Sequence, residues 1–194
     1  MRFSLRRGVR IFFLVSACAI AGPFAAAPAA QTGTQAATAV DDFNDRIKAY
    51  LSVRDKVAGD APQLKETSDP ARIAEAQKAL AGLIRNARAT AKPGDIFTPA
   101  IEKTFRSLLK WEVTATDGAT AKPVRPEEQP MVELKVNGDY PSKEPLATVP
   151  PAVLQALPAL PADKGLEYRF IRKHMILFDT QANLIVDFIL NALP

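Results

Sequence analysis

The side chains with the greatest potential for chemistry are few and are scattered along the chain. His174 is the only histidine in the 194 residues, and it follows two cations, Arg172 and Lys173, in a predicted hairpin turn. A general base needs an acidic group that orients it and a pocket that holds it. We therefore expect His174 to be a solvent-exposed turn residue. Contact between this basic turn and an anionic partner is the alternative.

Metal binding is not indicated by the residue types. Zinc, copper and nickel sites draw on several His or Cys ligands. Beyond the N-terminal leader described below, the chain offers one histidine and two methionines, Met131 and Met175, because the single cysteine, Cys18, lies within the leader. We expect neither a metal nor another cofactor.

Two further patterns are compatible with catalysis but have simpler explanations. Ser107 and Lys110 match Ser-x-x-Lys, in which a lysine one turn later activates a serine, but the companion Ser-Asp-Asn and Lys-Thr-Gly elements are absent. We expect both to be surface residues. Asp41-Asp42 is interpreted as charge at a helix start, and Glu127-Glu128 as charge in a solvated loop. No residue is therefore assigned a catalytic, cofactor-binding or metal-binding role.

The first 29 residues have the organisation of a secretory signal peptide. A basic segment over 1–10 precedes an apolar stretch over 11–21, and small residues follow. The apolar stretch has about half of the ~20 residues that a membrane-spanning helix needs. We predict cleavage after Ala29, no transmembrane helix, and a periplasmic or secreted bacterial protein.

Two other export routes remain open. Val15-Ser16-Ala17-Cys18 fits the pattern at which bacterial lipoproteins are cut and acylated on the cysteine, although the apolar character continues to Phe24. Arg6-Arg7 is compatible with the twin-arginine route, with a poor continuation after it. A lipoprotein anchored through Cys18 is therefore an alternative.

The basic character of the sequence belongs to this leader. The whole chain has a net charge of +4, yet residues 1–40 hold four arginines and no acidic residue. Without the leader, the number of cations equals the 21 Asp and Glu residues. Binding to nucleic acid depends on a basic surface that displaces counterions from phosphates, so this function class is excluded.

A helical region is predicted over 41–112, after a disordered tether over 30–40 that has no apolar periodicity. Apolar residues recur there at spacings of three and four, which is typical of amphipathic helices. Gly59 ends the first helix, Ser68 or Asp69 caps the second, and Thr98-Pro99 opens the third. Each of the three helices thus has an apolar stripe along one side. These stripes must be buried, so we expect a helical hairpin or a three-helix unit. Their members are Phe43, Ile47, Tyr50, Leu51 and Val57; Ile73, Ala76, Leu80, Leu83, Ile84 and Ala87; and Ile101, Phe105, Leu108 and Leu109.

The second half of the chain is predicted to be a small antiparallel sheet. A linker over 113–130 precedes a strand at 132–136 and a turn at Asn137-Gly138. A proline-rich strap over 141–163 contains one short helix after Pro150-Pro151. Its Pro158–Pro161 stretch has the spacing of a proline-rich ligand, but packing against its own sheet is favoured.

Three closing strands are expected at 166–171, 175–179 and 184–189, and their short connections permit only a β-meander. The last strand is apolar on both faces apart from Asp187, so this carboxylate needs a partner, and Arg169 or Lys135 would serve. The predicted fold class is α+β, with a helical region at 41–112 and a four-stranded β region at 131–194.

Five segments of the sequence stand out together: Lys92–Pro99, Phe105–Leu109, Pro145–Pro151, Leu166–Phe170 and Ala182–Ile189. They resemble a group of uncharacterised exported bacterial proteins. This resemblance implies a periplasmic location and brings no activity with it. The strand at 166–171 and the two strands after it are also similar to the small C-terminal β-unit of RcnB-type periplasmic proteins, but the His-rich region of those proteins is absent here.

The sequence favours a non-enzymatic interaction or scaffolding role. It shows more amphipathic helix than so small a sheet can cover, which leaves apolar surface for a protein partner or a second copy. A small periplasmic hydrolase, or an enzyme accessory factor that uses Asp, Lys, Tyr or Ser groups, is the alternative from another class.

Overall fold

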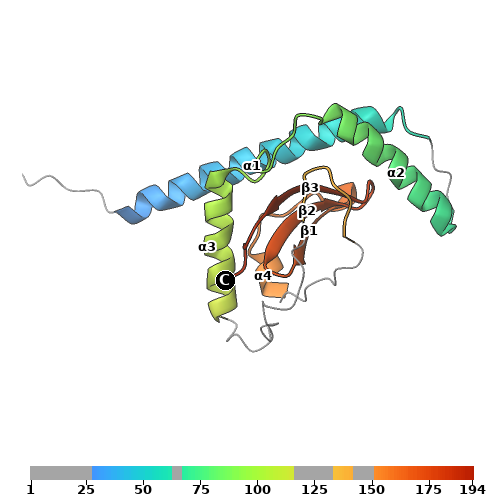
Figure 1. Ribbon diagram of the computed structural model, residues 1–194. Helices are drawn as coiled ribbons and strands as arrows, with labels where there is room; N and C mark the ends of the chain where they lie inside the picture. The colour runs from blue at the N-terminus through green and yellow to red at the C-terminus, as the bar shows by residue number, and fades with distance from the viewer. Residues whose placement is uncertain (1–27, 63–66, 116–132, 142–150) are drawn as a thin grey trace, which may run out of the picture.

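The computed structural model describes residues 28–62, 67–115, 133–141 and 151–194. Helices come first and a three-stranded antiparallel sheet comes last (Figure 1), which confirms the α+β class. A 3-10 helix at Ala162–Lys164 leads into the sheet. The other elements are α1 (Pro28–Ala58), α2 (Pro70–Ala87), α3 (Pro99–Ala115), α4 (Pro151–Gln155), β1 (Leu166–Ile171), β2 (His174–Asp179) and β3 (Leu184–Ile189).

Helix α1 begins much earlier than the apolar periodicity suggested. Residues 30–40 are helical rather than an irregular tether, and Figure 1 shows that the first turns of α1 extend past α3. Alanine and glutamine favour helix even without an apolar stripe, and the Thr38 hydroxyl donates to the Thr34 carbonyl at 3.0 Å. Ala39 is the first buried residue of the helix, so packing against the body starts there.

The starts of α2 and α3 agree with the sequence prediction. Asp69 caps α2, because its side chain accepts a hydrogen bond from the backbone N–H of Ala71 at 3.0 Å, and Pro70 occupies the first turn. The backbone N–H of Arg88 closes the helix on the carbonyl of Ile84. A short loop that contains Gly94 in a left-handed conformation then leads to α3.

The closing strands form the predicted meander, β1-β2-β3. Only two residues, Arg172 and Lys173, make the first turn, and Arg172 takes a positive φ of 55°. β2 therefore starts one residue earlier than expected, and His174 pairs with Ile171 across the strands. His174 is a strand residue, and its placement in the turn was wrong.

The fourth predicted strand is absent from the described part of its range. Residues 133–136 are irregular and lead into the expected turn, where the Gly138 N–H donates to the Lys135 carbonyl at 3.0 Å. After the turn, Asp139 forms one isolated antiparallel bridge with Leu184 of β3. Asn137 has a φ of 60°, and a Cβ at Gly138 would lie 2.9 Å from the Lys135 carbonyl oxygen. The segment therefore pairs with β3 through one isolated bridge rather than as a strand.

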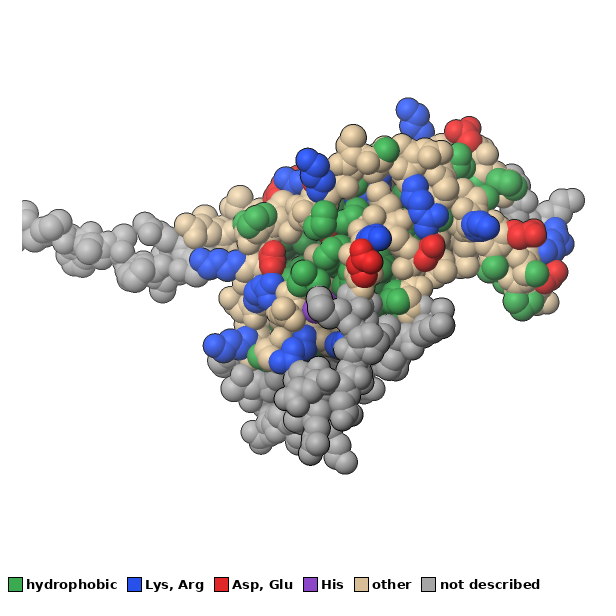
Figure 2. All heavy atoms as spheres, in the orientation of Figure 1, with side chains coloured by type: hydrophobic (Ala, Val, Ile, Leu, Met, Phe, Trp, Pro, Cys, Tyr) green, Lys and Arg blue, Asp and Glu red, His purple; other side chains and the backbone are tan. Residues whose placement is uncertain are grey.

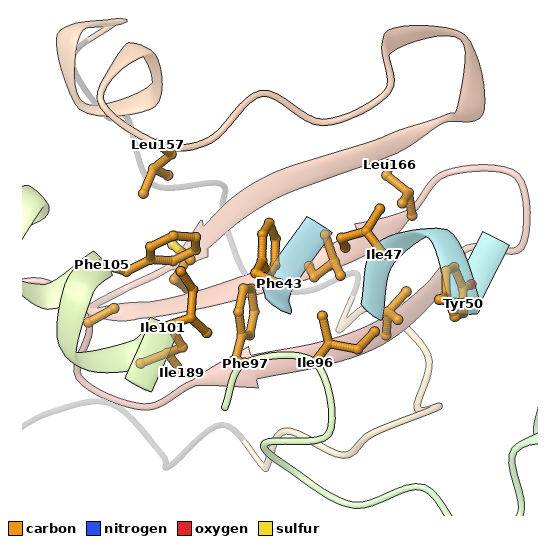
Figure 3. Close-up of a cluster of buried hydrophobic side chains, with 14 of the residues drawn as sticks. Phe43, Ile47, Tyr50, Ile96, Phe97, Ile101, Phe105, Leu157, Leu166 and Ile189 are labelled. Carbon is orange, nitrogen blue, oxygen red and sulfur yellow. The ribbon is translucent and has the colours of Figure 1, made fainter. Parts of the chain in front are cut away.

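One hydrophobic core joins the helices to one face of the sheet. At its centre, Phe43 of α1 stacks on Phe97 at 5.8 Å between ring centroids and meets Phe105 of α3 edge-on at 5.4 Å (Figure 3). Tyr168 of β1 packs edge-on against Phe105 at 6.0 Å. Helices α2 and α3 both pack against α1, at separate places along it (Figure 1). The helices thus close their core with the sheet.

The opposite face of the sheet carries a smaller apolar cluster. Leu134 and Tyr140, from the 133–141 segment, pack against it. The Arg169 guanidinium lies 4.0 Å from the centroid of the Phe178 ring. Both faces of β2 are therefore covered, which explains its nearly continuous apolar sequence. The buried members are Ile171, Ile176, Phe178 and Ile185.

Candidate functional site

A buried polar cluster links α1 to the end of β2. The Tyr50 hydroxyl donates to the Asp179 carboxylate at 2.7 Å, and the Arg54 guanidinium donates to the same oxygen at 3.2 Å. Arg54 is only 2% exposed and also donates to the Lys164 carbonyl at 2.6 Å. Burial and the Asp179 carboxylate both raise the pKa of Tyr50, so its hydroxyl stays protonated and acts as a donor.

The other carboxylate oxygen of Asp179 shapes the turn between β2 and β3. It accepts the backbone N–H groups of Gln181 at 2.9 Å and Ala182 at 3.1 Å. A buried charge is tolerated when it is paired and hydrogen-bonded, and all of these contacts come from the chain itself. The cluster therefore anchors α1 to the sheet.

Asp187 of β3 holds the loop that leads into α3. Its carboxylate accepts the backbone N–H groups of Gly94 at 3.1 Å, Ile96 at 2.8 Å and Phe97 at 2.9 Å. Burial raises the pKa of Asp187, and the backbone donors oppose that rise.

The predicted partners of Asp187 were therefore wrong. Arg169 pairs with Glu167 and lies over Phe178, and Lys135 pairs with Glu133. A loop whose N–H groups converge on one point takes the place of a cation. The signal available in the sequence was Gly94, which permits the left-handed backbone (φ 90°) of that loop.

Two arginines at the end of α2 fix the turn at Asn137. Arg88 donates to the Asn137 side-chain oxygen at 2.7 Å and to the Val186 carbonyl at 3.3 Å, and it lies 5.0 Å from the centroid of the Tyr50 ring. Burial lowers the pKa of Arg88. Arg85 donates to the Asn137 carbonyl at 2.8 Å and pairs with Asp139. These contacts bind α2 to the edge of β3.

His174 is half-buried and has a defined partner. Its Nδ1 accepts the backbone N–H of Asn191 at 2.9 Å, and burial, assisted by the charge of Arg172, lowers its pKa. The expectation of a solvent-exposed imidazole was wrong, because the C-terminal segment folds back onto the start of β2. No carboxylate among the described residues hydrogen-bonds to His174. Its imidazole therefore serves as a hydrogen-bond acceptor that holds the C-terminal segment in place. Met175 beside it is fully buried in the core.

The predicted serine–lysine pair lies on the exposed side of α3. An open hollow of about 400 Å³ lies there. The residues that line it are Pro99, Glu102, Lys103, Arg106, Ser107 and Lys110. The Ser107 hydroxyl donates to the Lys103 carbonyl one turn back at 3.0 Å, as helix serines often do. Both residues are exposed as expected, and the serine hydroxyl is bonded to a backbone carbonyl of its own helix.

A second, more apolar groove of about 330 Å³ lies between α2, the end of α1 and the β2–β3 turn. Gln77 closes one end of it, because its side-chain amide donates to the Thr180 carbonyl at 2.9 Å. Ile73 and Ala76, from the apolar stripe of α2, remain only half-buried. The lining residues are Ala58, Ala61, Pro62, Ile73, Ala76, Gln77, Leu80 and Gln181.

The remaining candidates of the sequence analysis do not converge. Asp41 is exposed, whereas Asp42 pairs with Arg46 at 2.9 Å. The Pro158 carbonyl accepts the Tyr168 hydroxyl at 3.0 Å, so this proline-rich stretch packs on the sheet. Cys18, Glu127-Glu128 and Met131 lie outside the described residues.

No set of three or more His, Cys, Asp or Glu residues that could hold a metal ion occurs within the described ranges. Among the helices described, none is both long and apolar enough to cross a membrane.

Sequence reasoning missed the burial of Arg54, although a signal was present. Arg54 follows Phe43, Ile47 and Tyr50 at helical spacing, so it lies on the apolar stripe of α1. A cation in that place predicts a buried anionic partner.

Comparisons of the chain with protein-family models, with curated proteins and with solved structures found no match.

Proposed function

We propose that this chain is an exported periplasmic protein that acts as a non-enzymatic interaction module. The observation that carries the proposal is that the buried charged side chains are bonded within the protein itself. In the described residues these are Arg54, Asp179 and Asp187, and each is bonded to backbone groups or to another of the set. Catalytic groups would instead be presented in a pocket with capacity left for a substrate.

The export part of the proposal rests on the leader, and the resemblance to exported bacterial proteins supports it. Its test is the intact mass of the chain recovered from the cell envelope. Cleavage after Ala29 predicts a mature chain that begins at Ala30. A chain that begins at an acylated Cys18 would establish the lipoprotein alternative, and an uncleaved chain in the cytoplasm would overturn export.

The interaction part of the proposal is supported by the groove beside α2. Ile73 and Ala76 are apolar, stay half-exposed and line an open groove rather than an enclosed cavity. An open apolar groove suits side chains of another protein better than a small molecule, which is usually bound in a more enclosed site. We therefore assign this face to a protein partner, and a second copy of the chain is the other outcome of the test.

Site-specific photocrosslinking in exporting cells tests this assignment. A photoreactive residue at Ala76 lies in the groove, and one at the exposed Ala74 on the same helix is the matched control. We expect one adduct of defined mass from position 76, identified by mass spectrometry and abolished by Ile73→Asp. Equal adducts from both positions, or none from either, would contradict the assignment.

The hydrolase alternative has its own test, because Ser107 lines the same hollow as Lys103 and Lys110. Hydrolysis of ester or peptide substrates by the purified chain, abolished by Ser107→Ala in a folded variant, would replace the interaction proposal.

A further inference from the structure

Helix α3 carries a basic surface on its exposed side. Lys103, Arg106 and Lys110 are spaced three and four residues apart, so they share one face of the helix, and all three line the hollow there. Figure 2 shows basic side chains gathered over α3. The one acid lining this hollow is Glu102, which pairs with Arg106. We call these three cations the basic face of α3.

An exposed leucine adjoins the basic face, and a second lies on a helix that packs against α3. In the described part of the chain, the large hydrophobic side chains with the greatest exposure are Leu190 at 49% and Leu154 at 43%. Arg106 donates to the Leu190 carbonyl at 2.7 Å and to the Asn191 carbonyl, which places Leu190 beside the basic face. Leu154 belongs to α4, which packs against α3.

The β1–β2 turn brings a further cation to the same region. The Leu193 N–H donates to the Lys173 carbonyl at 3.1 Å, and the Asn191 N–H donates to His174. The segment that Arg106 holds is therefore the one that pairs with this turn. Lys173 is exposed, so the positive charge continues from α3 to the end of the sheet.

We propose that the basic face of α3, with Leu190 at its side, docks on a bilayer surface that contains anionic phospholipid. This inference goes beyond the proposed function, because it concerns another face of the molecule, and it rests on the export that the proposed function includes. Interfacial membrane binding combines Lys and Arg at the headgroups with apolar side chains that enter the acyl boundary. The exposed Lys103 and Lys110 lie on either side of an arginine that is fixed to Glu102 and to the C-terminal segment. Two exposed lysines beside an exposed leucine fit that surface better than an acidic protein, which would require a shaped complement.

The size of the effect follows from the charges. Each Lys or Arg near an anionic bilayer strengthens binding about fivefold. Loss of two lysines from the face should weaken binding about 25-fold, and added salt should weaken it because exposed charges are screened over about 10 Å at moderate ionic strength.

Vesicle co-sedimentation with the exported chain is the test. A Cys18→Ser background excludes attachment by an acyl chain. Vesicles of phosphatidylcholine alone are compared with vesicles of phosphatidylcholine and phosphatidylglycerol in equal parts, at low and at moderate salt. We expect binding to the anionic vesicles only, and the double variant Lys103→Gln/Lys110→Gln should lose about 25-fold in affinity.

The control double variant is Lys56→Gln/Lys78→Gln, which makes the same charge change at the α2 end of the molecule (Figure 1). It should lose less than about twofold, and Leu190→Ser should weaken binding without removing its salt dependence. Circular dichroism confirms that each variant is folded.

Equal losses in the two double variants, or equal binding to both kinds of vesicle, would overturn the inference. If no vesicle binds but Lys103→Gln/Lys110→Gln abolishes an adduct formed by a photoreactive residue at Ser107, the basic face is a protein site and the lipid proposal falls. Neither result bears on the crosslinks from the α2 groove, so a failure of this inference is distinguishable from a failure of the proposed function.

Discussion

Replacement of Asp187 by alanine probes the contact that positions the start of α3. The buried N–H groups of Ile96 and Phe97, together with that of Gly94, would lose their acceptor. A buried donor without a partner costs about 1–3 kcal/mol, so the two most buried donors alone predict about 2–6 kcal/mol. Removal of the buried charge offsets part of this loss of stability, because burial raises the pKa of Asp187 and so disfavours its ionised form. We expect a net loss of about 3 kcal/mol.

Equilibrium unfolding in urea, followed by circular dichroism, measures this loss directly. A loss of 3 kcal/mol corresponds to a fall in Tm of roughly 6–12 °C for a chain of this size, and it is a large part of a typical stability of about 5–15 kcal/mol. Asp187→Asn retains one acceptor oxygen and should cost about half as much. The exposed Asp45→Asn, which removes a surface pair with Lys48, should change stability by less than about 0.5 kcal/mol.

A loss below about 1 kcal/mol for Asp187→Ala would refute this reasoning. It would mean that water or another acceptor satisfies the loop, and that the carboxylate is retained for another purpose. A folded Asp187→Ala variant that lost crosslinking at the α2 groove would point to such a purpose.

Three further predictions concern the other buried polar groups. Tyr50→Phe leaves Asp179 one donor short and should cost about 1–2 kcal/mol in urea unfolding, and an unchanged midpoint would contradict the hydrogen bond. Arg54→Met, which fills the same space without charge, should cost about 3–5 kcal/mol because Asp179 is left as a buried, unpaired anion; a more stable variant would show that the pair is dispensable. The lowered pKa of His174 means that its contribution to stability is complete above about pH 6.5 and is lost as the pH falls below that value. His174→Asn should therefore flatten the fall in stability between about pH 7.5 and 5.5, and identical pH profiles would show that the burial of His174 has no such effect.

The sequence was most informative where one periodicity applied to a whole element. The caps and prolines at Asp69-Pro70 and Thr98-Pro99 located two helix starts, and the short connections of 166–189 left the meander as the one possible topology. These features act within a few residues, so a sequence displays them directly.

The errors arose where distant residues decide the structure. Residues 30–40 continue a helix whose packed part lies further along the chain, and the strand expected at 132–136 gives way to a turn that meets β3 at Asp139. The burial of Asp187 followed from its apolar neighbours, but its partners are backbone groups about 90 residues earlier. No periodicity encodes that contact.

The measurement that tests the central claim most directly is the crosslinking yield at position 76 in two folded variants. The central claim is that the buried polar network serves stability and that an exposed surface serves function. It predicts that Tyr50→Phe lowers the unfolding free energy but keeps the adduct, whereas Ile73→Asp abolishes the adduct. An adduct that disappears in folded Tyr50→Phe, or persists in Ile73→Asp, would contradict it.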